Sequence, residues 1–254
     1  MPDLHKPSEI AVLVESAGVT KARAGTGNLL VLSALAGAFI AFGAAFYTIT
    51  MTGIEPGYGP ARVLGGLTFS LGLILVIVGG AELFTGNALI VMAWVEGLVT
   101  GSELARNWII VYFGNAVGSL LLAMLIHLSG LLDGAFGQTA ASIATAKLAL
   151  DPVELFSRAI LCNALVCLAV WLSFAARTAA GKVVTIIFPI TAFVALGFEH
   201  SIANMYLLPV GAAAGAEAPV SAIVSNIAIA TIGNIIGGAG GVALAYRFAF
   251  KPQG

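Results

Sequence analysis

Long apolar runs, separated by short polar stretches, dominate the pattern of this chain. A helix that crosses a bilayer needs about 20 mainly apolar residues. Six stretches qualify, at about 28–52, 63–95, 107–132, 153–175, 183–209 and 223–249. The second and fifth are too long for one simple crossing, and each has a glutamate near its middle, Glu82 and Glu199. The pattern predicts an all-α integral membrane protein of six transmembrane helices, with helices two and five interrupted.

A shorter amphipathic segment precedes the first apolar run, at about residues 8–23. It carries apolar residues at helical spacing among polar ones: Ile10, Leu13, Val14 and Ala17. This pattern is typical of a helix that lies along the membrane surface. The scattered charges, and the length of the apolar block that follows, argue against a signal peptide. We therefore predict an N-terminal tail (1–25), a single transport domain (26–250) and a short C-terminal tail (251–254).

The distribution of Lys and Arg predicts the orientation, because these residues gather on the cytoplasmic side of membrane proteins. An even number of spans places both termini on one side. That side would hold Lys6, Lys21, Arg23, Arg106, Arg177, Lys182, Arg247 and Lys251, and the other side Arg62, Lys147 and Arg158. Eight against three predicts that both termini are cytoplasmic. The loops at 54–62, 133–152 and 210–222 would then face outward.

Composition narrows the class of protein further. The chain is 59% hydrophobic and only 9% charged, whereas soluble domains carry about a quarter charged residues. Its net charge of −1 provides no basic field for nucleic acid. Cys162 and Cys167 stand in an apolar run at a spacing that forms no CxxC pair, so we expect buried thiols rather than a metal or redox site.

Polar and glycine residues within the apolar segments form an internal repeat. GAELFTGN (80–87) and GFEHSIAN (197–204) share the pattern G-x-E-x-x-x-x-N, while GNAVG (114–118) and GNIIG (233–237) share G-N-x-x-G. The offsets are 117 and 119 residues, in the same order. With three spans in each half, at about 26–132 and 150–250, the halves insert with opposite orientation. Interrupted helices in such inverted repeats mark transport sites near the membrane midplane.

Four polar residues of this repeat are expected to be structural: Glu82, Asn87, Glu199 and Asn204. A charge at the bilayer centre costs about 2.5–3.5 kcal/mol on insertion scales, so it must face protein or water. Each glutamate follows a Gly-x pair, where a helix can break and leave backbone groups unpaired. We expect the carboxylates to accept hydrogen bonds from those N–H groups and the asparagines to bridge others.

His200 is the expected functional residue of the repeat, because histidine can donate, accept and change charge near neutral pH. His127 lies in the third segment and is expected to be a packing or interface residue, and His5 is expected to be solvated. The Gly-rich stretches GNAVGS and GNIIGGAGG indicate close helix packing. They are not phosphate loops, since no strand precedes them and the chain lacks G-x-x-x-x-G-K.

These motifs resemble the formate/nitrite transporter family. The resemblance rests on GFEHSIANM, GAELFTGN, NALVCLAVWLS (163–173), VYFGNAVG (111–118) and TIGNIIGG (231–238), and it covers about residues 25 to 249. It implies an aquaporin-like fold with inverted halves, and a homopentamer with one pore in each subunit. It also implies a bacterial or archaeal cytoplasmic membrane protein that is not an enzyme and needs no cofactor.

The resemblance also implies roles for particular residues. Thr85 would face His200, Asn163 would line the pore near it, and Lys147 would draw anions into the outer vestibule. Two apolar constrictions would bracket the histidine, formed by Phe69, Leu73, Leu83, Phe84 and Phe193; the sequence does not assign each residue to one of them. Phe193 lies seven residues before His200, so on a continuous helix both would share one face.

The expected mechanism follows from the cost of moving an anion through an apolar slit, which vanishes for its neutral acid. Lys147 would concentrate the anion, and His200 and Thr85 would hold it and exchange a proton with it, with Asn163 adding a hydrogen bond. Phe198 before Glu199 favours formate, and GAELFTGN is also compatible with nitrite. Both are small, flat oxyanions that pocket chemistry separates poorly. Lactate, acetate and hydrosulfide are less favoured.

Three other functions stay open. His127 and His200 could ligate a haem between segments three and five, in which case the protein would be coloured. Ser201 beside His200 suggests a hydrolase, although adjacent helical residues point apart and no second base is evident. A water or glycerol facilitator would normally carry paired Asn-Pro-Ala boxes, which this chain lacks.

Overall fold

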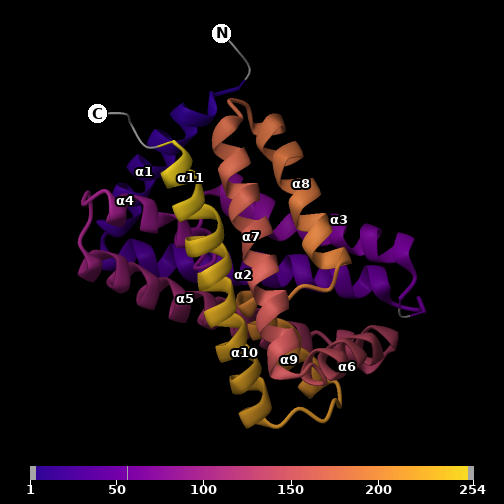
Figure 1. Cartoon of the computed structure of the whole chain (residues 1–254). Coiled ribbons are helices and arrows are strands. Elements are labelled where there is room, and N and C mark those ends of the chain that lie inside the picture. The colour runs from indigo at the N-terminus through magenta and orange to yellow at the C-terminus, as the bar shows by residue number, and fades with distance from the viewer. Residues whose placement is uncertain (1–3, 56, 251–254) are drawn as a thin grey trace.

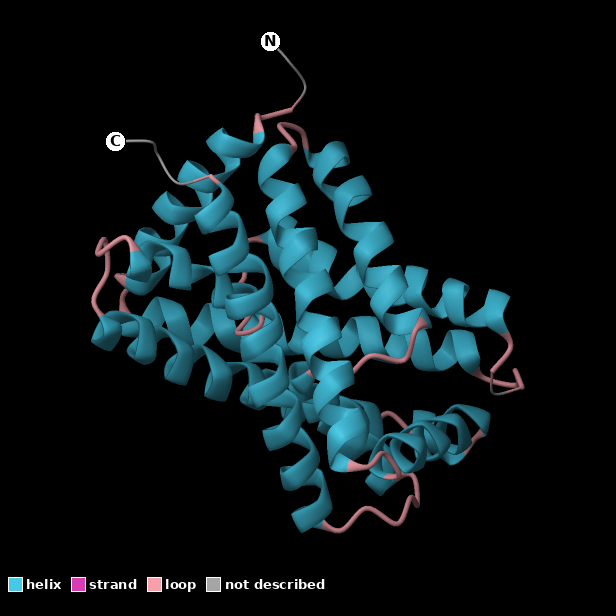
Figure 2. Ribbon diagram, in the orientation of Figure 1, coloured by secondary structure: helices cyan, strands magenta, loops and turns pink. Residues whose placement is uncertain are grey.

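The computed structural model describes residues 4–55 and 57–250, and these form helices joined by short loops (Figures 1 and 2). The longer helices are α1 (Pro7–Ala22), α2 (Thr26–Met51), α3 (Gly59–Gly79), α5 (Gly101–Leu128), α6 (Ala135–Leu148), α7 (Pro152–Ala175), α8 (Ala179–Ala195), α9 (Ser201–Ala213) and α10 (Val220–Ile235). Shorter pieces are the 3₁₀ turns η1 (Gly86–Ile90) and η2 (Leu131–Asp133), α4 (Val91–Val95), the π-helical η3 (Ile236–Leu244) and α11 (Ala245–Ala249). The expected tail at 251–254, Lys251 included, and residues 1–3 lie outside the described residues.

Five helical stretches are long and apolar enough to cross a membrane: α2, α3, α5, α7 and the continuous run Val220–Ala249. Their mean hydropathy is 1.8 to 2.3. α8, α9 and the stretch Gly86–Val95 are apolar but shorter. The fifth predicted segment therefore consists of two helices, and the second consists of α3 followed by a short, irregular helical stretch. Both predicted segments are longer than one crossing because a second helical stretch follows a non-helical break.

A glycine in the left-handed conformation precedes each break. Gly80 follows α3 with a φ of 83°, and Gly197 follows the end of α8 with a φ of 73°. Residues with a Cβ rarely adopt this conformation, so glycine is the residue that ends these helices without strain. Both glycines are the first residue of the G-x-E pattern, 117 residues apart. The repeated sequence motif thus encodes where two helices stop.

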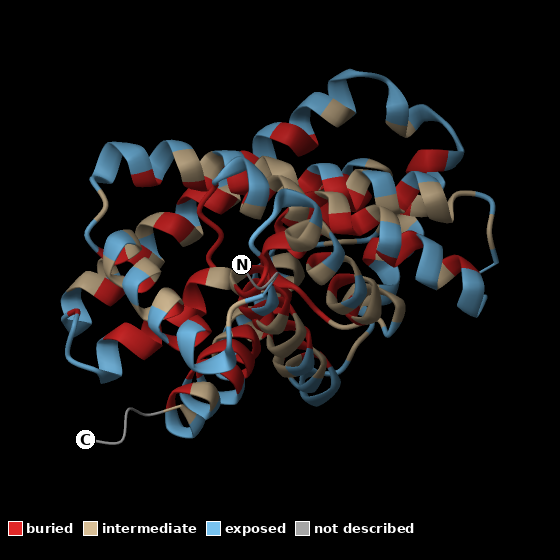
Figure 3. Ribbon diagram, turned by 90° about the horizontal axis from the view of Figure 1, so that it is seen from above, coloured by how far each residue is buried: buried red, intermediate tan, exposed pale blue. Residues whose placement is uncertain are grey.

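The G-N-x-x-G segments lie where helices cross most closely. A Cβ added at Gly118 would collide with the carbonyl oxygen of Ala34 in α2, and one at Gly237 with that of Ile160 in α7. Small residues let helix backbones approach in this way. The crossings bring the buried residues together in the middle of the molecule, while outward faces stay exposed and apolar (Figure 3).

Two expected boundaries differ from the structure. The outward loop expected at 133–152 contains the 14-residue helix α6. Its sequence AFGQTAASIATAKL is short and mixes small and polar residues, so it lacks the long apolar run by which the other helices were predicted, although its buried residues Phe136, Ala140 and Ala144 recur at helical spacing. The third segment begins at Gly101 rather than near 107, because Thr100 and Glu103 form a capping box there.

The N-terminal helix is tied to the rest of the chain by ion pairs. Lys21 contacts Glu82, and Arg23 Nε lies 3.0 Å from Glu103. The buried Arg247 of α11 contacts both Glu96 and Glu15 of α1, so α1 and α11 lie at the same end of the molecule (Figure 1). Burial raises the pKa of Glu15 from its ordinary value, against the opposing attraction of Arg247.

Candidate functional site

His200 is the residue that begins α9 after the second break. Its backbone is extended, and its Nδ1 atom accepts a hydrogen bond from the Ala203 N–H at 3.1 Å, so the imidazole caps the helix. Its Nε2 atom lies 3.0 Å from Thr85 Oγ1, on the loop that follows the first break. Because Nδ1 accepts, the proton of the neutral ring belongs on Nε2, where it is donated to the threonine hydroxyl. The two breaks therefore meet at one histidine–threonine contact.

Aromatic rings cover the imidazole on one side. The Phe193 ring lies 5.9 Å from the His200 ring, with 23° between their planes. Phe69 meets Phe193 edge to face, with ring centroids 5.5 Å apart. All three side chains are buried. The two phenyl rings thus place apolar surface against the one titratable ring at the break.

A cavity of about 540 Å³ leads to these residues. We name it the basic pocket, since it is lined by Arg62, Lys147 and Arg158, with Glu199 as the acidic residue of its wall. The buried residues Phe69, Phe193 and His200 also line it, and α6 contributes Gln138 and Ser142. The three cations assigned from sequence to the outward side therefore converge on one cavity.

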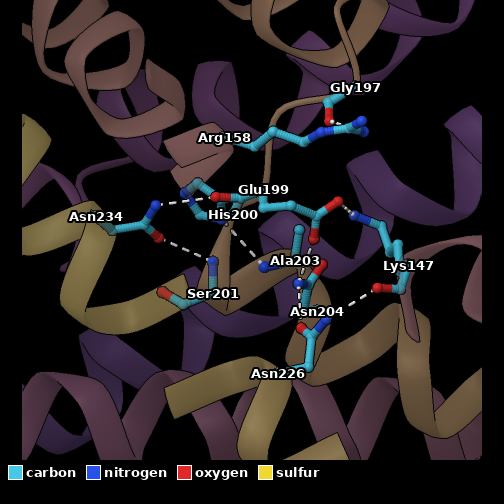
Figure 4. Close-up of polar contacts among 10 residues, drawn as sticks. All are labelled: Lys147, Arg158, Gly197, Glu199, His200, Ser201, Ala203, Asn204, Asn226 and Asn234. Atoms are coloured by element: carbon cyan, nitrogen blue, oxygen red, sulfur yellow. Dashed lines mark hydrogen bonds and ion pairs between the residues drawn. The ribbon is translucent and has the colours of Figure 1, made fainter. Parts of the chain in front are cut away.

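Glu199 is held by a chain of polar contacts on the wall of this pocket (Figure 4). Lys147 Nζ lies 2.8 Å from one carboxylate oxygen, and Asn204 Nδ2 donates to the other at 2.8 Å. Asn204 also donates to Asn226 Oδ1, and Asn226 Nδ2 donates to the Lys147 carbonyl at 3.2 Å. The Glu199 side chain is 3% exposed, so the lysine compensates a carboxylate that is otherwise withdrawn from water.

The same contacts occur a second time around Glu82. Its carboxylate lies 2.7 Å from Lys21 Nζ and accepts from Asn87 Nδ2 at 2.8 Å. Asn87 donates to Asn107 Oδ1, and Asn107 donates to the Lys21 carbonyl. This pair is more open, with side-chain exposures of 31% for Lys21 and 12% for Glu82. The carboxylates thus accept side-chain donors, and not the backbone N–H groups that we expected from the sequence.

Two asparagines satisfy the backbone groups at the breaks instead. Asn234 Oδ1 accepts from the Ser201 N–H, and its Nδ2 donates to the Glu199 carbonyl (Figure 4). The same Nδ2 also donates to the carbonyl of Ala159 in α7. Asn115 makes the equivalent contacts to the Phe84 N–H and to the carbonyls of Ser33 and Glu82. Each asparagine belongs to a G-N-x-x-G segment. These segments therefore form hydrogen bonds to backbone groups at the breaks, in addition to providing close helix packing.

The remaining expected residues lie around this centre. Asn163 donates to the carbonyls of Thr85 and Asn234, and its buried Oδ1 has no hydrogen-bond partner among the described residues. Leu73 and Leu83 are buried in the central core, away from the basic pocket. Phe84 is buried there too, with its ring edge to face against Trp108 and Tyr112.

Known proteins resemble this chain along nearly its whole length. The family model described as formate/nitrite transporter matches residues 8–248. The chain belongs to the formate/nitrite transporter family. It is 41% identical to the formate channel FocA of Escherichia coli strain K12, over 96% of this chain and 94% of that protein. It is therefore a multi-pass membrane protein.

Solved structures of this family share the fold. A structure described as a pentameric formate channel with formate bound matches with a TM-score of 0.81 and 38% identity, covering 89% of this chain and 97% of that one. A structure described as an FNT family ion channel matches with a TM-score of 0.88 and 28% identity, covering 95% and 98%. The helical architecture is thus that of the formate/nitrite transporter family.

Five residues of the polar network escaped our sequence analysis: Lys21, Asn107, Asn115, Asn226 and Asn234. The duplicated G-N-x-x-G motif already contained Asn115 and Asn234, but we interpreted it through its glycines. Asn107 and Asn226 stand at the same offset of 119 residues, so a comparison of the two halves position by position could have found them. Lys21 and Lys147 lie outside the predicted repeats and gave no such signal.

The residues behind the haem and hydrolase alternatives are placed unfavourably for those functions. Both ring nitrogens of His200 are within hydrogen-bonding distance of other groups, so neither is free to ligate iron. His127 is exposed on α5. The Ser201 hydroxyl has no hydrogen-bond partner in the described part of the chain, so no base activates it as a nucleophile.

Proposed function

We propose that this protein is a channel for small monovalent anions, with formate as the preferred substrate, and that His200 is its central pore residue. The observation that carries the proposal is the path from the basic pocket, past the Phe69–Phe193 pair, to the His200–Thr85 contact. The chain's similarity to the formate channel FocA supports the choice of substrate. The pentameric formate channel that it resembles supports a homopentamer.

The basic pocket would serve as the outer vestibule. Its wall carries three cations and one carboxylate, and this net positive charge raises the local concentration of anions. Lys147 is already paired with Glu199, so much of the attraction comes from the two arginines. Lys147 instead neutralises Glu199, the residue next to His200, and so keeps the buried carboxylate from repelling the incoming anion.

The Phe69–Phe193 pair would form the outer constriction. A hydrated anion loses water on passing two buried phenyl rings and gains no polar partner in return. The neutral acid avoids that cost. Leu73, Leu83 and Phe84, which lie away from the basic pocket, would form the inner constriction. Selectivity for small, weakly basic anions then follows from the ease with which they take up a proton.

The His200–Thr85 contact would be the point of proton exchange. With the Nε2–H donated to Thr85 Oγ1, the hydroxyl proton of Thr85 is available to an anion between the constrictions. If Thr85 gave that proton away and recovered one from Nε2, an imidazolate would remain unless Nδ1 also carried a proton. That second proton would replace the hydrogen bond from Ala203. Proton delivery is therefore coupled to the cap of α9.

Asn163 would contribute the remaining hydrogen bond. Both N–H groups of its amide are donated to backbone carbonyls, and its Oδ1 atom is buried without a partner among the described residues. An unpaired acceptor of this kind suits an O–H donor, which the neutral acid has and the anion lacks. The amide thus favours the protonated form of the substrate in the pore.

Nitrite is the second candidate substrate. The family's description includes it, and nitrite and formate present similar hydrogen-bonding edges. Flux through liposomes distinguishes them: formate and nitrite influx are measured over a range of pH with the wild type and with His200→Asn. We expect formate to be carried faster, with a pH dependence that the variant loses while its oligomeric state is preserved. Unaltered pH dependence in an intact variant would refute the proton role.

A matched variant separates the two functions of the imidazole. Asparagine is a good helix N-cap, so His200→Asn retains a partner for the Ala203 N–H while losing the reach to Thr85. His200→Ala loses both contacts and should be less stable by about 1 kcal/mol. Loss of pH dependence in both variants, with a stability loss only in His200→Ala, is the expected result.

A further inference from the structure

Arg62 and Arg158 form a pair of cations in the basic pocket, and attraction of the permeant anion alone does not explain why they lie so close together. A Cβ placed on Gly197 would lie 2.9 Å from Arg62 Nη2 and 3.7 Å from Arg158 Nη1. The two guanidinium groups therefore converge on one point, although they come from different helices, α3 and α7. Arg158 also reaches the Gly197 carbonyl at 3.5 Å (Figure 4).

Neither arginine forms an ion pair with an acid among the described residues. Ion pairs within 4.0 Å are present elsewhere in the described part of the chain, but none involves Arg62 or Arg158. Two like charges held close together without a counter-ion repel one another. Both side chains are only partly exposed, so solvent screens them incompletely. The arrangement is complementary to a carboxylate, which guanidinium groups bind with two parallel hydrogen bonds.

The size and walls of the pocket indicate what else the ligand carries. A volume of about 540 Å³ falls in the range of cavities that hold drug-sized ligands, and it far exceeds what a one-carbon acid fills. Apolar side chains line much of it, among them Met51, Ile54 and Phe198. A hydrocarbon group attached to the carboxylate would bury apolar surface there, which favours binding.

We propose that the basic pocket is a binding site for organic monocarboxylates larger than the permeant ion. The carboxylate lies between Arg62 and Arg158, and the hydrocarbon group lies against the apolar wall. Such a ligand is too wide for the Phe69–Phe193 pair, so it occupies the mouth and slows formate from that side. Binding itself does not depend on the proposed function, whereas the block of flux rests on it.

Calorimetric titration of the purified wild-type protein with benzoate tests the site directly. We expect saturable binding of benzoate, none of its neutral analogue benzamide, and weaker binding of sulfate, which has charge but no hydrocarbon. Arg62→Gln and Arg158→Gln should each weaken benzoate about tenfold, since each loses a charge-assisted hydrogen bond. The benzoate affinity of Arg158→Lys should fall between those of the wild type and Arg158→Gln, because lysine keeps the charge but cannot form the two parallel hydrogen bonds of a guanidinium group.

Arg177→Gln is the matched control, because Arg177 is exposed in the α7–α8 loop and does not line the pocket. The proposal is overturned if the wild type shows no saturable benzoate binding, if sulfate binds as tightly as benzoate, or if Arg177→Gln weakens benzoate as much as the pocket variants do. Gel filtration of each variant reports folding, and Arg158→Lys provides the measurement if a glutamine variant fails to assemble.

Formate influx in liposomes with external benzoate then separates this proposal from the proposed function. Benzoate should inhibit the wild type and Arg177→Gln at the same concentration, and Arg62→Gln only at about tenfold higher concentration. Benzoate binding without any formate flux would contradict the channel and leave the site standing. Formate flux that is insensitive to benzoate would contradict the block and leave the channel standing.

Discussion

Among the described residues, the Thr85 hydroxyl is the hydrogen-bond partner of His200 Nε2, and Thr85 is 1% exposed. Its partner imidazole is fixed from behind by the Ala203 N–H. Because Thr85 Oγ1 accepts the proton of His200 Nε2, its own hydroxyl proton is free to be donated to an anion in the proposed pore. At the residue scale, the proposed chemistry therefore depends on an oxygen rather than on side-chain size.

Replacing Thr85 tests this dependence. Thr85→Val keeps the shape and removes the hydroxyl, so formate flux should fall about tenfold, the equivalent of one hydrogen bond of about 1.4 kcal/mol. Thr85→Ser keeps the hydroxyl and should retain most of the flux. Both are measured in liposomes at one pH, with the amount of reconstituted protein matched. Equal loss in Thr85→Ser and Thr85→Val would show that packing, not the hydroxyl, is needed.

The Lys147–Glu199 ion pair is expected to matter for stability rather than for transport chemistry. Removing one partner of a buried ion pair is costly, because it leaves the other charge buried and unpaired. Lys147→Met leaves a carboxylate that is 3% exposed without its cation, which should cost about 3–5 kcal/mol of stability. Adding Glu199→Gln should recover much of that loss. Thermal unfolding of the detergent-solubilised protein measures both variants.

The equivalent pair at the other break supplies the control. Lys21 and Glu82 are more exposed, at 31% and 12%, so water compensates the carboxylate when its lysine is lost. Lys21→Met should therefore destabilise less than Lys147→Met. The reverse order would mean that burial does not set the cost of these pairs.

At the scale of the element, two helices are allowed to break because asparagines from neighbouring helices take up the freed backbone groups. Asn234 makes two such bonds, to the Ser201 N–H and the Glu199 carbonyl, and a third to the Ala159 carbonyl of α7. Unpaired backbone groups in an apolar interior cost about 1–3 kcal/mol each. The breaks are thus maintained from outside the broken helix, by residues more than thirty positions away in the sequence.

Replacing Asn234 should destabilise the chain around the break between α8 and α9. Asn234→Ala leaves the Ser201 N–H and the Glu199 carbonyl without a partner, whereas the Ala159 carbonyl keeps its place inside α7, and it should lower stability by on the order of 3 kcal/mol. Asn234→Asp keeps the acceptor for the Ser201 N–H but loses both donors, so we expect an intermediate loss. Asn28→Ala, at an exposed position of α2, is the matched control and should melt like the wild type. Wild-type melting of Asn234→Ala would contradict the bridging role.

Sequence patterns predicted the elements of this fold unequally. The apolar runs located α2, α7 and the final helix closely, because lipid-facing helices are marked by composition alone. The Gly-x-Glu motif located both breaks, since few residues adopt the conformation of Gly80 and Gly197. α6 was missed, because it is short and weakly apolar, and the helical spacing of its buried residues Phe136, Ala140 and Ala144 rests mostly on alanines.

The polar network was harder to predict than the helices. Thr85 and His200 were paired only through the family resemblance, and no spacing rule joins residues 115 positions apart. Lys21 and Lys147 each sit on a helix before the predicted repeat, so their contacts with the glutamates depend on how that helix packs. Arg62 and Arg158 were assigned to a side of the membrane from sequence, but their convergence on Gly197 required the structure.

At the scale of the whole molecule, the charges divide between two ends. Arg62, Lys147 and Arg158 line the basic pocket, while α1 and α11 lie together at another end through Glu15 and Arg247. Apolar residues cover the surface between, among them Phe113 at 62% and Phe188 at 74% exposed. The positive-inside rule then predicts that the end with α1 faces the cytoplasm and the basic pocket faces outward.

Cysteine accessibility tests this orientation with little background, because both native cysteines, Cys162 and Cys167, are fully buried. Glu217→Cys places a thiol in the exposed loop before α10, and Ala180→Cys places one at the start of α8. A membrane-impermeant maleimide added to intact cells should label the first and not the second. After the cells are permeabilised, both should label, which controls for reactivity, and the wild type should stay unlabelled. Labelling of Ala180→Cys alone in intact cells would reverse the assignment, and the basic pocket would then receive anions from the cytoplasm.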